Sequence, residues 1–241
     1  MRAHRVRALL MGGQACVFYG AAEFSRDTDF AILADTANLA RLRKALAELQ
    51  AGVIAVPPFA LKYLRRGHAI HFRCQHPDAR RLRVDAMSKM RGVDAFPKLW
   101  KRRTTIELPD GTTSDLLSLP DLVQAKKTQH DKDWPMIRRL VEAHYFQHRD
   151  QATAAQIRFW LRELRTPEIL IELARSHAAA CHRLTLRRPL LAEAARADRT
   201  ALERALLAEE TAERQRDRQY WQYWQYWLPL RAELEKLRHG K

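Results

Sequence analysis

Two acidic residues near the N-terminus have the spacing of a metal site. Residues Ser25–Leu33 alternate between two sets of side chains, which predicts a strand with Asp27 and Asp29 on the same side. Converging carboxylate oxygens suit a hard divalent cation such as Mg²⁺, which binds one or two carboxylates plus substrate phosphates. Paired acids also occur on solvent-facing strands at sheet edges. The pair therefore predicts a metal site, with a solvated strand as the alternative.

A glycine turn precedes this pair by a short interval. The apolar run Val6–Met11 predicts a strand that ends at Gly12-Gly13, and residues 14–19 predict a short helix that ends at Gly20. A Gly-Gly turn at a helix start exposes backbone N–H groups and lets a phosphate approach without a Cβ clash. A metal pocket close to a phosphate pocket is what phosphoryl or nucleotidyl transfer requires.

The same two stretches carry a family resemblance. Residues 11–20 and Ser25–Phe30 resemble the signature of the DNA polymerase β-like nucleotidyltransferase superfamily. In that family a strand, a Gly-Gly or Gly-Ser turn, a short helix and an Asp-x-Asp strand build the active site. The family adds a third carboxylate from a later strand, and the segment Arg83–Met87 offers Asp85 for that position.

A downstream segment narrows the resemblance to one branch. Leu119–Lys126, followed by Lys132-Asp133, is similar to the helical motifs of the AbiEii-type nucleotidyltransferases, and Lys126 and His130 match a Lys-x-x-x-His spacing found there. That branch contains toxin–antitoxin and phage-defence enzymes. The resemblance therefore implies a toxin-like or defence role and a cognate antitoxin or toxin partner.

The resemblance also implies roles for individual residues. Transfer of a nucleotidyl group from an NTP to an acceptor hydroxyl would use two Mg²⁺ ions, with Mn²⁺ as an alternative ion. The metal ligands would be Asp27, Asp29 and Asp85, and Lys126 would join them as a catalytic residue. The residues expected to bind the nucleotide are Gly12, Gly13, Gln14, Ser25, Lys126 and Asp133.

The charge balance points to a polyanionic partner. The chain has 241 residues, with 43 Lys and Arg against 28 Asp and Glu, a formal charge of +15. Such a surplus is typical of proteins that bind nucleic acid or nucleotides, and it favours RNA, tRNA in particular, as the acceptor. One basic cluster follows the Asp85 strand, and a solvated face is its alternative; its members are Lys98, Lys101, Arg102 and Arg103.

Two other functions remain open at this stage. The acceptor could be a protein hydroxyl on a partner, as in nucleotidylating antitoxins, or the chain could be a catalytically idle module that binds nucleic acid or a partner. The repeat at residues 220–227, Tyr-Trp-Gln-Tyr-Trp-Gln-Tyr-Trp, has two interpretations as well. It could pack against helices or a second protomer, or it could stack unpaired bases.

The pattern of elements predicts an α+β protein with a change of class near residue 118. Residues 1–117 favour a mixed sheet with flanking helices, and residues 118–241 favour an all-α domain that completes the cleft. Asp35 predicts an N-cap for a helix over 37–49, and Pro109-Asp110-Gly111 predicts a hairpin turn. Strands are expected over His68–Cys74 and 81–87.

The remaining composition suggests a cytoplasmic protein. Three scattered cysteines support neither a disulfide framework nor a zinc knuckle, and no apolar run is long enough to span a membrane. The start of the chain has the outline of a secretory signal, but Gly12-Gly13-Gln14 interrupts its apolar stretch. His71 is predicted to face away from His68 and Cys74, which argues against a zinc site there.

Overall fold

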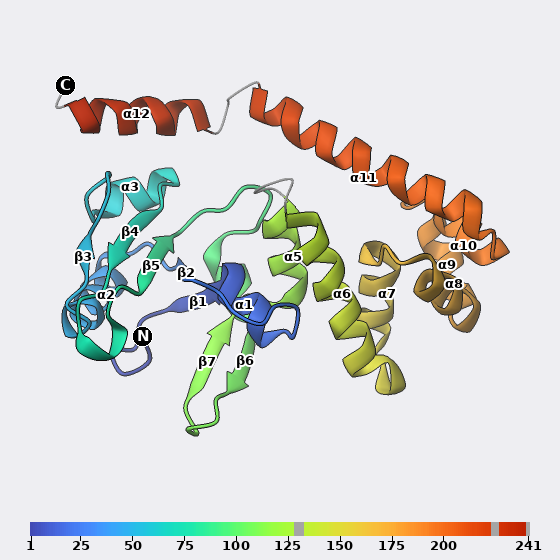
Figure 1. Cartoon of the computed structure of the whole chain (residues 1–241), viewed down its shortest axis with the longest axis horizontal. Helices are drawn as coiled ribbons and strands as arrows, with labels where there is room; N and C mark the ends of the chain where they lie inside the picture. The colour runs from blue at the N-terminus through green and yellow to red at the C-terminus, as the bar shows by residue number, and fades with distance from the viewer. Residues whose placement is uncertain (128–132, 223–226, 240–241) are drawn as a thin grey trace. The chain divides into compact units, whose positions relative to one another are not determined.

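The computed structural model describes residues 1–127, 133–222 and 227–239 of the chain (Figure 1). It divides into two compact units. The first comprises Met1–His130 together with Trp224–Lys241, and the second comprises Asp131–Tyr223. The predicted α+β class is confirmed, with a mixed sheet in the first unit and helices throughout the described part of the second.

The first unit is built on a seven-stranded sheet in the order β3-β4-β5-β2-β1-β7-β6. Its strands are β1 (Ala8–Met11), β2 (Asp27–Ile32), β3 (Gly52–Val53), β4 (Ile70–Arg73), β5 (Arg83–Met87), β6 (Thr104–Glu107) and β7 (Thr113–Leu116). β1 pairs antiparallel with β2 and parallel with β7, while β2 pairs parallel with β5. Both parallel pairs join strands far apart in the sequence, so they depend on long crossover connections.

The predicted strand and helix at the start of the chain are present, but Gly12 and Gly13 form the first turn of the helix and not a separate turn before it. β1 is buried along its whole length, and α1 (Gly12–Phe18) follows it without an intervening residue. Gly20 has a φ of 73° just after the helix, a left-handed conformation that glycine adopts without a steric penalty. The chain then turns back and enters β2 beside β1.

One face of the sheet carries the main apolar core of the first unit. α2 (Thr36–Glu48) begins at Asp35, whose side chain accepts a hydrogen bond of 2.6 Å from the Asn38 amide, as the sequence predicts. Leu39, Leu42 and Leu46 of this helix are buried against residues of β4 and β5. The first unit also contains α3 (Leu61–Arg66) and α4 (Phe96–Lys101).

The predicted hairpin is formed by β6 and β7, and a helix follows it directly. α5 (Leu119–Lys127) begins after Ser118, whose hydroxyl donates to Asp121 Oδ2 at 2.6 Å. Arg102 donates two hydrogen bonds of 2.7 Å to the same carboxylate. These contacts tie α5 to the sheet-bearing unit, whose N-terminal segment extends to His130, beyond the change of composition near residue 118.

The C-terminal helix belongs to the first unit, although the sequence analysis assigns it to the helical domain. α12 (Trp227–His239) lies beside α3 in Figure 1. Its Glu233 contacts Arg66, and its Oε2 lies 2.8 Å from Nε2 of His68, a side chain that is 2% exposed. Burial opposes ionisation of Glu233, but the contacts with His68 and Arg66 hold its pKa below the ordinary range.

The second unit is a set of helices around a core with buried charges. Its helices are α6 (Trp134–His148), α7 (Ala154–Glu163), α8 (Pro167–Ser176), α9 (Ala178–Thr185), α10 (Leu191–Arg196) and α11 (Arg199–Gln222). Arg188 is buried, and it donates to the carbonyl oxygens of Leu161 and Leu164 and to both carboxylate oxygens of Glu209. These bonds join the end of α7 to α11 without leaving the guanidinium unpaired.

Among the described helices, none combines the length and the apolar composition that a membrane crossing demands. Four residues of the aromatic repeat, 223–226, lie outside the described residues, as do His130 and Lys132.

Candidate active site

The glycine turn and β2 fit closely together. Gly12 has a φ of 65°, and a Cβ on it would lie 1.9 Å from Oδ2 of Asp29. A Cβ on Gly13 would lie 2.5 Å from the hydroxyl oxygen of Ser25. Both glycines therefore make room for side chains at the start of β2. Ser25 in turn donates a hydrogen bond of 2.9 Å to the backbone oxygen of Asp27.

Strand pairing brings the three predicted carboxylates together. Asp29 of β2 is directly opposite Asp85 of β5, and Asp27 is opposite Arg83. Directly opposed residues of paired strands share a face of the sheet, and so do residues two apart along one strand. Asp27, Asp29 and Asp85 consequently project from one face, beside the Gly12-Gly13 turn.

The electrostatics of Asp29 reflect this crowding. Burial raises its pKa to about 6, and the negative charges of Asp85 and Asp27 push it in the same direction. The positive charges of Lys126 and Arg83 oppose the rise. A cation beside Asp29 would offset both its burial and the negative charges of its neighbours.

Asp85 is held by two residues that the sequence analysis does not place in the site. Arg83 donates to both of its carboxylate oxygens at 2.9 Å, and Nδ1 of His71 lies 2.9 Å from Oδ1. Burial alone would raise the pKa of Asp85, but the hydrogen bonds from His71 and Arg83 hold it below the ordinary range. The third carboxylate is therefore ionised and already paired.

The sequence contains a weak signal for Arg83 but none for His71. Arg83 stands two positions before Asp85, so strand alternation alone puts it on the same face. His71 is opposite Asp85 across the β4–β5 ladder, a relation that becomes visible only when the register is known.

We expect Arg83→Gln to destabilise the first unit by about 1–2 kcal/mol at neutral pH, because Asp85 loses its bidentate partner while staying buried. Since the native pKa of Asp85 is lowered, its contribution is present above the ordinary aspartate pKa and is lost as pH falls through the native value. The deficit should therefore shrink in strongly acid solution. Urea denaturation at several pH values measures it, with exposed Arg80→Gln as the control; equal effects of the two variants would contradict this prediction.

The structure places the other three residues that we expect to bind the nucleotide at different positions. Lys126 is buried on α5 and its charge acts on Asp29, so tertiary structure brings it to the site. Gln14 is half-buried on α1, next to the glycine turn. Asp133 belongs to the second unit, where it is the N-cap of α6.

The predicted basic cluster is largely paired within the chain. Arg102 contacts Asp121 and Asp94, and Lys98 lies 3.4 Å from Asp94. Arg103 contacts Asp115 at 3.0 Å, and its guanidinium lies 4.3 Å from the ring centroid of Trp100. Lys101 is exposed at the end of α4. A phosphate that contacts Lys98, Arg102 or Arg103 must compete with these acidic partners. Arg102 also holds α5 in place through Asp121.

Two of the predicted ligands, Asp27 and Asp29, are suitable for binding a hard cation. Asp27 and Asp29 supply adjacent carboxylates from one strand, which is the number that Mg²⁺ takes when substrate phosphates complete its shell. Within residues 1–127, 133–222 and 227–239, no group of three or more His, Cys, Asp or Glu side chains is arranged to hold a metal ion. Asp85 can become a third ligand only if it separates from Arg83 and His71.

Comparison with known proteins does not assign the chain to a family. No protein-family model matches the chain, and no curated protein matches it. The site must therefore be interpreted from its own residues.

Proposed function

We propose that the protein is a Mg²⁺-dependent nucleotidyltransferase that moves a nucleotidyl group from an NTP to an acceptor hydroxyl and releases pyrophosphate, with RNA as the acceptor. One observation carries the proposal. The parallel pairing of β2 and β5 puts Asp85 beside Asp29, next to a glycine turn that has no space for a Cβ. Acids on one face beside a tight glycine turn are an arrangement suited to a metal ion and a triphosphate.

Each residue of the site would have a separate role in the transfer reaction. Asp27 and Asp29 would hold the cation, which supplies charge neutralisation for the phosphate under attack. Lys126, buried near Asp29, would pair with a phosphate oxygen. Gly12, Gly13 and Gln14 would line the triphosphate. Arg83 and His71 hold the Asp85 carboxylate in a fixed orientation, and Asp85 would accept the proton of the acceptor hydroxyl once that hydroxyl replaces one of these two partners.

The formal charge of +15 supports an RNA acceptor. Such an acceptor should be bound largely through its phosphates, so the logarithm of its affinity should fall linearly with the logarithm of salt concentration, by about 0.7 per phosphate neutralised. We expect Lys101→Glu to flatten this slope by about 0.7 or more without changing thermal stability, because Lys101 is exposed.

The control is Lys44→Glu, an equal charge change at an exposed position of α2. Filter binding of tRNA at several salt concentrations gives both slopes. Equal slopes for the two variants would remove the basic cluster from the RNA interface, and undetectable RNA binding at low salt would favour a protein acceptor.

The pairing of Asp85 with Arg83 favours a second candidate, a module that keeps the fold and binds nucleic acid without catalysis. The two candidates differ in a labelling assay with radiolabelled NTPs, Mg²⁺, deproteinised total RNA and protein fractions. Label on RNA that is lost in Asp29→Asn supports the proposed enzyme, and label on one polypeptide supports a protein acceptor. RNA binding without labelling of either fraction supports the idle module.

A further inference from the structure

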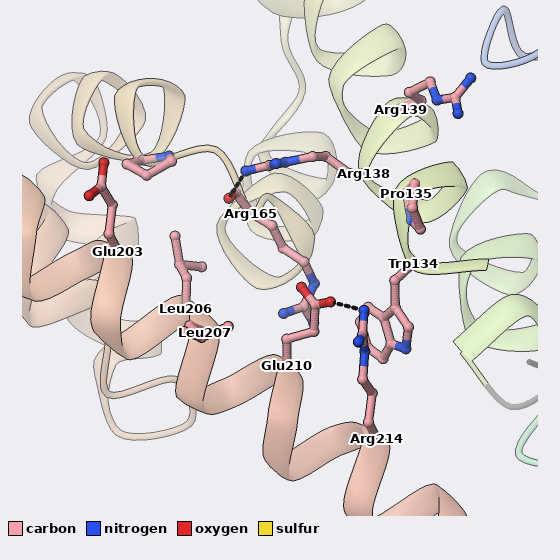
Figure 2. A pocket seen from close by; sticks show the side chains of 11 residues that line it. Trp134, Pro135, Arg138, Arg139, Arg165, Glu203, Leu206, Leu207, Glu210 and Arg214 are labelled. Carbon is pink, nitrogen blue, oxygen red and sulfur yellow. Dashed lines mark hydrogen bonds and ion pairs between the residues drawn. The ribbon is translucent and has the colours of Figure 1, made fainter. Parts of the chain in front are cut away.

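A second site lies wholly within the helical unit. A pocket of about 430 Å³ opens between α6, α8 and α11, and Figure 2 shows the side chains that line it. Trp134 forms part of its wall and is buried. Its volume is within the range of sites that bind small organic ligands. It is formed by residues 134–214, so its structure does not depend on the carboxylate site of the first unit.

The pocket contains buried arginine donors that lack acceptors. Arg165 is 4% exposed, and its guanidinium lies 4.6 Å from the ring centroid of Trp134. Its terminal nitrogens contact Glu209 and Glu213, whereas its Nε is buried without a hydrogen-bond partner in the part of the chain that the structure describes. Arg214 repeats the pattern: it contacts Glu210, and its Nε also has no acceptor within the described residues. Buried donors without acceptors favour a ligand that brings oxygen atoms.

Two helix N-termini add positive potential to the same pocket. Trp134 and Pro135 form the first turn of α6, and Pro167 begins α8; all three line the pocket. The N-cap residues of these helices are Asp133 and Thr166, and neither side chain caps its helix. Pro135 and Pro167 have no backbone N–H, so the helix dipoles and the first-turn N–H groups of the neighbouring residues are what would stabilise an anion.

The charged rim is mixed, with an excess of arginine. Arg138 and Arg139 join Arg165 and Arg214, against Glu203 and Glu210 among the lining acids. Arg138 donates to the backbone oxygen of Arg165 at 2.9 Å, a bond drawn in Figure 2. Arg139 is exposed on α6. Several guanidinium groups around one cavity suit a phosphate better than a single carboxylate, because a phosphate accepts more hydrogen bonds and carries more charge.

The remaining wall is apolar. Leu206 and Leu207 of α11 line the pocket together with Pro135 and Pro167, and Leu207 is 69% exposed. A leucine so exposed beside a row of arginines would pack against the organic part of a ligand whose anionic part is bound by the guanidinium groups. Guanidinium planes also stack on nucleobases. We propose that this pocket binds a nucleoside monophosphate, either free or as the terminal nucleotide of an RNA.

The test measures binding to the full chain in EDTA, so that any divalent-dependent binding elsewhere is absent. Titration calorimetry with AMP, GMP, CMP and UMP should give saturable one-site binding for at least one of them. The matched nucleoside and inorganic phosphate alone should each bind at least about tenfold more weakly, because each lacks half of the contacts. A short oligoribonucleotide with and without a 5′-phosphate distinguishes an RNA end from the free nucleotide as the source.

Two charge-reversal variants distinguish binding in this pocket from a general effect of the protein's positive charge. Arg138→Glu should weaken nucleotide binding about tenfold or more, because the Arg138 side chain reaches across the pocket toward Arg165 in Figure 2. Arg204→Glu, an equal change at an exposed position of α11 that does not line the pocket, should leave binding within about twofold. Three results would overturn the proposal: no saturable nucleotide binding in EDTA, equal losses in the two arginine variants, or phosphate that binds as tightly as the nucleotide.

Discussion

Replacing Asp29 by Asn should abolish nucleotidyl transfer and at the same time stabilise the fold. Removing one of two adjacent ligands should lower activity at least about a hundredfold. Stability should rise because the native pKa of Asp29, about 6, lies above its ordinary value of 3.8. Ionisation of this buried acid opposes folding, so in the absence of divalent ions the wild type loses stability as pH rises from about 4 to about 7. The variant should gain about 1–2 kcal/mol at pH 8 and nothing below pH 4.

Both parts of this result are measurable on one pair of proteins. Urea denaturation in EDTA across the pH range gives the stability difference, and the labelling assay gives the activity. Asp78→Asn is the control, because its side chain is 92% exposed and the same chemical change should do nothing. Transfer at the wild-type rate in Asp29→Asn would remove this residue from the proposed metal site, and a stability gain that did not depend on pH would contradict the assigned cause.

A methyl group at position 12 should damage both the fold and the site. Gly12→Ala forces a left-handed φ of 65° on alanine and places Cβ 1.9 Å from the Asp29 carboxylate. The backbone strain costs about 1–2 kcal/mol and the clash a further 1–3 kcal/mol, so we expect a total loss of about 2–5 kcal/mol. Transfer should fall to background under conditions in which the variant is still folded, because Asp29 must move.

Gly111→Ala isolates the backbone strain from the clash. Gly111 has a φ of 76° at the β6–β7 turn, and a Cβ there meets no atom within 4 Å. This variant should therefore show only the strain of about 1–2 kcal/mol, with normal activity. Thermal denaturation and the labelling assay on both variants make the comparison. Equal losses of stability would show that the contact between Gly12 and Asp29 is unimportant.

The sequence by itself determined the local elements. The β1–α1 unit, the hairpin at Pro109-Asp110-Gly111 and the helix capped by Asp35 are confirmed, because their signals are local: apolar runs, turn residues and a capping side chain. The period of two residues along a strand also placed Asp27 and Asp29 on one face. Asp85 was identified by resemblance, and its position on β5 agrees with the expected strand.

Only the tertiary structure decided which strands are neighbours and in which register. The β2–β5 pairing joins residues more than fifty positions apart, and neither periodicity nor turn chemistry carries information about such a pairing. The roles of Arg83 and His71 follow from that register. The boundary between the units has a similar origin. The composition changes at residue 118. Arg102, however, binds Asp121 across 19 positions and holds α5 against the sheet-bearing unit. The buried carboxylate of Asp121 requires a cationic partner, and tertiary structure brings Arg102 to it.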